Sequence, residues 1–188
     1  MKKRLAVFFP GRRYGVDCPL LYYAESVCRK KGYDTLLMHY SEHRDVRDMI
    51  AIEENIRVTL PYAKERILEI NFTQYDEVLF VSKSIGTVIA GWLEQELGRE
   101  QTGAARRIRH IFMTPLAQTF PYMKARKNIV ICGAGDKYLD AEQLKEFCEE
   151  HDVRRYCFEG VGHSMEHEKM EDTLKTMREI MEIVEEFA

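Results

Sequence analysis

Residues 78–87 read VLFVSKSIGT, and this stretch decides which fold the rest of the chain builds. The apolar run Val78–Val81 has the length of a buried strand, and the pattern at 85–97 is typical of a helix. Ser84 lies where the predicted strand passes directly into the helix, and a sharp turn at such a junction raises the side chain above the sheet. The stretch therefore predicts a strand–turn–helix unit that displays a serine hydroxyl.

The same alternation of short apolar runs and longer amphipathic stretches continues in both directions. Strands are predicted at Leu5–Phe9, Thr35–Met38, Val78–Val81, Ile108–Met113, Ile129–Cys132 and Val153–Phe158. Helices are predicted at Pro19–Lys31, Glu53–Asn71, Ile85–Leu97, Ala141–Glu150 and Glu166–Phe187. This alternation predicts an α/β fold, a doubly wound and mostly parallel six-stranded sheet with helices on both faces.

The last predicted helix carries apolar residues at helical spacing, and we expect this stripe to pack on the core. Its members are Met170, Leu174, Met177, Ile180, Met181 and Val184.

Composition limits the class of protein. Of the 188 residues, 45% are hydrophobic and 31% charged, which is typical of one soluble globular domain spanning 1–188. The formal net charge of -3 argues against a nucleic-acid partner. No apolar stretch approaches the ~18 residues of a membrane span, so we expect no membrane partner. The five cysteines, an odd number, indicate a reducing compartment, and we expect a cytoplasmic protein.

Polar groups follow three of the predicted strands. Ser84 follows the third strand, Asp136 comes after Cys132 within a glycine-rich turn, and His163 comes after Phe158 within another. In parallel sheets, ligands bind beyond the carboxyl ends of the strands, so these three groups are expected at one edge.

A serine, a histidine and a carboxylate are the groups that nucleophilic catalysis needs. The hydroxyl is a weak nucleophile until a base removes its proton, and a histidine near its usual pKa can take and return that proton. A buried carboxylate fixes the tautomer of the histidine. Each group alone has an ordinary structural explanation, a helix cap for Ser84, an Asx-turn for Asp136 and an exposed loop for His163. Their chain order, Ser, Asp and then His, favours a shared catalytic site.

With these motifs the sequence resembles the α/β-hydrolase family over nearly its whole length. Residues 81–86 look like the family's nucleophile elbow, 133–136 like its acid turn and 162–164 like its histidine loop. The resemblance implies a sheet order of 2-1-3-4-5-6. It also implies that the usual cap is reduced to a vestigial segment, 114–127.

The resemblance also implies an oxyanion hole. Its donors would be the backbone N–H groups of Ile85, next to the nucleophile, and of Arg12, in the loop after the first strand. Ser82 departs from the family pattern, which most often has glycine there. Lys83, beside the nucleophile, is unusual and is a candidate contact for an anionic substrate. The residues expected to border the substrate are Gly11, Arg13, Tyr14, Lys83 and Pro115.

The implied activity is hydrolysis of a small-molecule acyl substrate, an ester, thioester or activated amide, through an acyl-enzyme. This chemistry requires neither a cofactor nor a metal ion. Two alternatives stay open: acyl transfer to another acceptor through the same residues, and a non-catalytic module that uses the helix N-terminus at Ser84 as an anion site. The oligomeric state also stays open.

Two histidine patterns suggest metal sites. Residues 163–167 match H-x-x-E-H, an inverted zinc-protease motif, but the glycines at 160 and 162 favour a loop over the helix that this motif needs. His39 and His43 lie four residues apart with Asp45 and Asp48 nearby, which could form a metal or substrate contact or a solvated loop.

Overall fold

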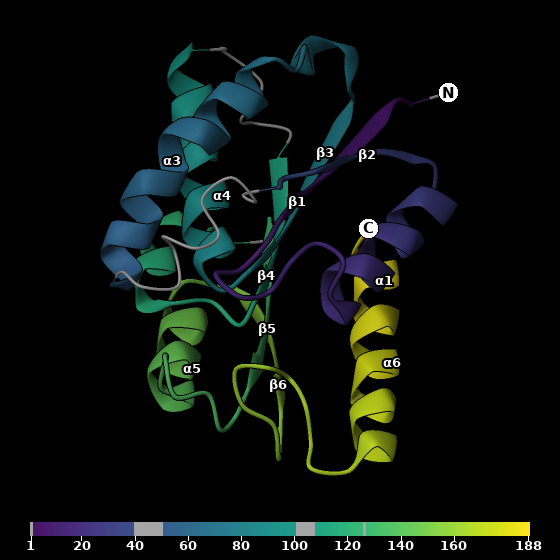
Figure 1. The fold of residues 1–188 in the computed structure, drawn as a ribbon, viewed down its shortest axis with the longest axis vertical. Coiled ribbons are helices and arrows are strands. Elements are labelled where there is room, and N and C mark those ends of the chain that lie inside the picture. The colour runs from purple at the N-terminus through teal and green to yellow at the C-terminus, as the bar shows by residue number, and fades with distance from the viewer. Residues whose placement is uncertain (1, 40–50, 101–107, 126) are drawn as a thin grey trace.

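In the computed structural model, which describes residues 2–39, 51–100, 108–125 and 127–188, six parallel strands form one sheet (Figure 1). The strands are β1 (Arg4–Phe9), β2 (Tyr33–Leu37), β3 (Glu77–Lys83), β4 (Ile108–Met113), β5 (Asn128–Gly133) and β6 (Arg154–Phe158). Their order is β2-β1-β3-β4-β5-β6, and every neighbouring pair is parallel. The predicted fold class and strand order are both confirmed.

Helices cover both faces of the sheet. α3 (Ile52–Leu68), α4 (Ile85–Glu100) and α5 (Ala141–Glu150) lie on one face, and α1 (Pro19–Lys30) and α6 (Met170–Phe187) on the other (Figure 1). Two 3-10 helices, η2 (Phe72–Gln74) and η4 (Ala117–Tyr122), lie in connections. Within the described ranges, no helix combines the length and the apolar character needed to cross a bilayer.

The inner strands β1, β3 and β5 are buried along nearly their whole length, because helices cover both faces of the sheet. In β3, Val78 and Phe80 join the core under α3 and α4, whereas Leu79 and Val81 join the core under α1 and α6. All four side chains are buried. This packing on both faces fixes the position of β3 in the sheet, and with it the position of the turn between β3 and α4.

The segment between β4 and β5 contains η4 and lies against α4. A Cβ added at Gly91 of α4 would be 2.4 Å from the Cβ of Tyr122, so only glycine permits this approach. The hydroxyls of Thr87 and Thr119 share a hydrogen bond of 2.6 Å, which joins η4 to the first turn of α4.

The last helix differs from its prediction. It begins at Met170 rather than Glu166, and Met170 and Leu174 are 69% and 61% exposed, so their predicted packing on the core was wrong. In the first turns of α6, Thr173 is the residue that faces the protein interior. Its hydroxyl accepts a 2.9 Å hydrogen bond from the backbone N–H of His167. The start of α6 therefore anchors the preceding loop, and its buried apolar packing begins at Met177.

Gly86 sits where α4 passes closest to β1. A Cβ there would be 2.4 Å from the carbonyl oxygen of Phe9 and 2.6 Å from that of Pro10. Helix propensity alone favours alanine over glycine by ~1 kcal/mol. The clash with backbone atoms reverses this sign, and we expect Gly86→Ala to lower the free energy of unfolding by ~1–3 kcal/mol.

Urea denaturation measures this change. Gly98→Ala is the matched control, because Gly98 lies in the same helix and is exposed. It should be neutral or gain up to ~1 kcal/mol. A gain in stability at position 86 would contradict the close approach of α4 to β1.

Candidate active site

Ser84 occupies a strained turn between β3 and α4. Its φ is 56°, in the left-handed region that residues with a Cβ seldom adopt. The turn is held on both sides: Ser84 N–H donates to the carbonyl of Met113 at 3.1 Å, and Thr87 donates to the Ser84 carbonyl through N–H and hydroxyl, at 2.9 and 2.6 Å. The strain is therefore retained by hydrogen bonds on either side of Ser84, as expected for a nucleophile elbow.

The turns that carry Asp136 and His163 are joined to each other. Gly135 N–H donates to the carbonyl of Val161 at 2.9 Å, and Ala134 N–H donates to that of Phe158 at 2.9 Å. A Cβ at Gly133 would be 2.5 Å from the Val161 oxygen, so the glycine lets the two chains approach. The two glycine-rich turns thus form one rigid unit beyond β5 and β6.

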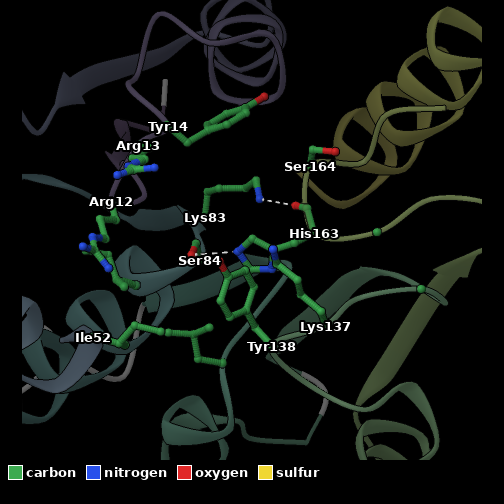
Figure 2. Close-up of a pocket in the computed structure, with 14 residues that line it drawn as sticks. Arg12, Arg13, Tyr14, Ile52, Lys83, Ser84, Lys137, Tyr138, His163 and Ser164 are labelled. Atoms are coloured by element: carbon green, nitrogen blue, oxygen red, sulfur yellow. Dashed lines mark hydrogen bonds between the residues drawn. The ribbon is translucent and has the colours of Figure 1, made fainter. Parts of the chain in front are cut away.

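This unit carries His163 to Ser84. His163 Nε2 is 2.8 Å from Ser84 Oγ (Figure 2). On the other side of the ring, His163 Nδ1 is 2.7 Å from Asp136 Oδ2. A carboxylate only accepts hydrogen bonds, so Nδ1 carries the proton and Nε2 accepts from the hydroxyl. The other carboxylate oxygen, Oδ1, accepts from the N–H of Tyr138 at 2.9 Å, which fixes the orientation of Asp136. The structure brings the three sequence-predicted groups together in one continuous chain of hydrogen bonds.

Burial sets the protonation of the histidine. It lowers the pKa of His163 below its ordinary 6.5, and the hydrogen bond to Asp136 opposes this shift. The side chain of Asp136 is only 3% exposed, and the Tyr138 ring packs edge-on against the imidazole at 4.6 Å between ring centres. The imidazole is therefore neutral at neutral pH, which is the form that can accept a proton.

The loop after β1 lies against the nucleophile elbow. Gly11 N–H donates to the carbonyl of Tyr14 at 2.9 Å, and a Cβ at Gly11 would be 3.2 Å from Ser84 Cβ. Arg12 follows at this close approach. On the other side, Ile85 is the first residue of α4, where backbone N–H groups have no intrahelical partner and the helix dipole favours negative charge.

A cavity of ≈ 550 Å³ opens at this edge of the sheet. Figure 2 shows Arg12 and Arg13 on one side of Ser84, with His163 and Tyr138 on the other. The full set of lining residues is Arg12, Arg13, Tyr14, Ile52, Lys83, Ser84, Ile85, Leu116, Gly135, Lys137, Tyr138, Gly162, His163 and Ser164. Of the residues expected to border a substrate, Gly11 and Pro115 are outside this set, and Leu116 lines the wall beside Pro115 instead.

Sequence reasoning missed Tyr138, although it lies only two residues beyond Asp136. An aromatic residue two positions after a candidate acid is the signal that could have identified it. Ile52 and Leu116 carried no such signal, since both fall in ordinary apolar patterns.

Lys83 lines the cavity, but its amino group is bound within the protein. The side chain is 1% exposed, and Nζ donates to Thr114 Oγ1 and to the backbone carbonyl of His163, both at 2.6 Å. This arrangement differs from the substrate-facing lysine suggested by the sequence.

The two histidines of the H-x-x-E-H pattern face different partners. His163 contacts Ser84 and Asp136, whereas His167 Nε2 lies 2.9 Å from Thr176 Oγ1. In the ranges that the structure describes, no three His, Cys, Asp or Glu side chains are grouped to hold a metal ion. The second pattern falls largely on His43, Asp45 and Asp48, which lie outside the described residues.

No family model matches the chain, and no curated protein matches it by sequence. Among solved structures, a Xanthomonas campestris pv. campestris protein assigned to the alpha/beta superfamily of hydrolases matches at a TM-score of 0.63 and 14% identity, covering 99% of both chains.

Two further solved structures also match. Est1E from Butyrivibrio proteoclasticus, solved with bound ferulic acid, has a TM-score of 0.66 and 11% identity over 99% of this chain and 88% of its own. Thermogutta terrifontis esterase 2, phosphonylated by cyclosarin, has a TM-score of 0.59 and 15% identity over 99% and 81%. With its strand order and these neighbours, the chain has the α/β-hydrolase fold.

Proposed function

We propose that the protein is a serine hydrolase that cleaves a small ester, thioester or activated amide through an acyl-enzyme. The observation that carries this proposal is the chain of hydrogen bonds from Ser84 Oγ through His163 to Asp136, at 2.8 and 2.7 Å. These distances lie in the range that proton transfer from nucleophile to base requires.

In the acylation step, Ser84 Oγ attacks the substrate carbonyl carbon as His163 Nε2 takes the hydroxyl proton. The imidazolium that forms is stabilised by Asp136, which stays ionised. Negative charge develops on the carbonyl oxygen, and the N–H groups of Ile85 and Arg12 are the proposed donors to it. Each such donor is typically worth ~3–4 kcal/mol in the transition state. His163 then gives its proton to the leaving group as the carbon–leaving-group bond breaks.

Deacylation repeats these steps with water. His163 takes a proton from a water molecule, the resulting oxygen attacks the acyl carbonyl, and Ser84 leaves with the proton returned by His163. The products are a carboxylic acid and the free enzyme.

The size and lining of the cavity support a small-molecule substrate. Its ≈ 550 Å³ falls in the range of small-molecule sites, and the wall combines apolar groups such as Leu116 and Ile52 with polar ones. The segment 114–125 packs against α4 through η4, and a cap segment this short favours acyl groups that are short or attached to an exposed chain.

A fluorophosphonate probe tests the proposal, because it modifies only an activated serine. We expect stoichiometric labelling of the wild-type protein near neutral pH and none in Ser84→Ala. Hydrolysis of p-nitrophenyl esters of increasing chain length, beside an acyl thioester, then defines the acyl group. A folded wild-type protein that takes up no probe would instead favour the non-catalytic binding module.

A further inference from the structure

Lys83 is the last residue of β3 and directly precedes the proposed nucleophile. It ranks among the largest fully buried side chains, at 1% exposure. Lysines are seldom buried to this extent, since transfer of an amino group out of water costs free energy unless it is hydrogen-bonded. A lysine so placed, beside the site yet closed to solvent, calls for an explanation beyond packing.

The amino group joins three loops. It donates to Thr114 Oγ1, after β4, and to the backbone carbonyl of His163, after β6, both at 2.6 Å. It also lies 5.0 Å from the ring centre of Tyr14, after β1. Figure 2 shows Lys83 extending from beside Ser84 to the backbone of His163.

The hydrogen bond from Lys83 to His163 is made with the backbone carbonyl of His163, the proposed base. The imidazole stays within hydrogen-bond distance of Ser84 only while the His163 loop keeps its position relative to the end of β3. A displacement of ~1 Å can lower the rate about 10²-fold. The hydrogen bond from Lys83 holds the His163 loop in position relative to β3, the strand that leads to the nucleophile.

The positive charge of Lys83 also affects the pKa of the His163 imidazole. Burial lowers the pKa of the Lys83 amine to about 7, while Asp136, Glu166 and Cys18 act to raise it. The pKa of His163 is lowered mainly by burial; the cations of Lys83 and Lys137 also lower it, and Asp136 raises it. Where His163 titrates, below 6.5, Lys83 is still protonated and disfavours the imidazolium.

We propose that Lys83 is a positioning residue, which ties the His163 loop to the strand carrying Ser84 and so keeps the imidazole within reach of the hydroxyl. This inference rests on the proposed hydrolase function. It gives a role to a side chain that contacts neither the reacting atoms nor the solvent.

The test compares Lys83→Met, which keeps the length and apolar stem but has no donor and no charge, with Thr114→Ala. The latter removes the other hydrogen-bond partner and leaves both the tie to His163 and the cation. For a p-nitrophenyl ester, we expect Lys83→Met to lower kcat by ~10- to 100-fold with KM within about threefold. Thr114→Ala should keep kcat within about threefold of wild type.

The pH profile separates positioning from mere packing. The acid limb of kcat/KM reports the base of the free enzyme, and in the wild type we expect it below 6.5. Loss of the cation in Lys83→Met should move this limb to higher pH, whereas Thr114→Ala should leave it in place. Equal losses of kcat in the two variants with unmoved limbs would reduce Lys83 to a structural residue, and wild-type kcat in Lys83→Met would overturn the inference.

A measurement on the wild-type protein covers the case in which Lys83→Met does not fold. The imidazole signals of His163, followed by NMR against pH, should move in two steps, its own below 6.5 and a second near pH 7 as the Lys83 amine titrates. A single step would contradict the coupling. Absence of fluorophosphonate labelling in the wild type would remove the proposed function and this inference with it. Equal labelling rates in wild type and Lys83→Met would remove only the inference.

Discussion

Replacement of His163 by alanine is expected to lower kcat for ester hydrolysis by about 10⁶-fold, the size of effect seen when a serine hydrolase loses its base. The reason is that Ser84 Oγ, now 2.8 Å from Nε2, would have no group to take its proton. Steady-state kinetics with a p-nitrophenyl ester, together with fluorophosphonate labelling rates, measures the loss.

His167→Ala is the matched control, because His167 belongs to the same loop but faces Thr176. Its kcat should stay within about threefold of wild type, with a loss of ~1 kcal/mol in stability from the broken hydrogen bond. If both histidines proved equally necessary for hydrolysis, the assignment of the base to His163 would fail.

Asp136→Asn is expected to lower kcat by about 10⁴-fold without unfolding the protein. The N–H of Tyr138 donates to Oδ1, so the asparagine oxygen takes that position and its amide NH₂ faces His163 Nδ1. Nδ1 must then accept a hydrogen bond, which moves the ring proton to Nε2. In that tautomer Nε2 cannot take the proton of Ser84, and the site is intact in shape but inactive.

Asp140→Asn is the control for this change. Asp140 caps α5 by accepting from the N–H groups of Glu142 and Gln143, and asparagine is an equally good cap. Its kcat should stay within about twofold of wild type. A loss of less than tenfold in Asp136→Asn would mean that the carboxylate does not set the tautomer of His163.

The positions of the chemical groups could be predicted because they depend on local patterns. Apolar runs ending in glycine-rich turns identify buried parallel strands, and the rule that ligands bind beyond strand ends gathers Ser84, Asp136 and His163 at one edge. The glycines at 86 and 133 were part of these motifs, and both are required by close approaches between backbones.

The start of α6 could not be predicted in this way. Residues 166–169 are compatible with a helix in isolation, but His167 is held by Thr173 and Thr176 and His163 by Ser84 and Asp136. These contacts join residues far apart in the chain or across a turn, and they keep the segment in a loop. The exposure of Met170 follows from the same anchoring.

The sequence by itself determined the α/β class and the three loops that follow the strands, because periodicity and turn chemistry act over a few residues. The strand order was implied only by the resemblance of the three motifs to the α/β-hydrolase family. Only the tertiary structure decided where Lys83 points, that Tyr138 covers His163, and which wall residues shape the cavity. Those outcomes depend on packing between loops from different strands, and no pattern within one segment encodes the distance to another.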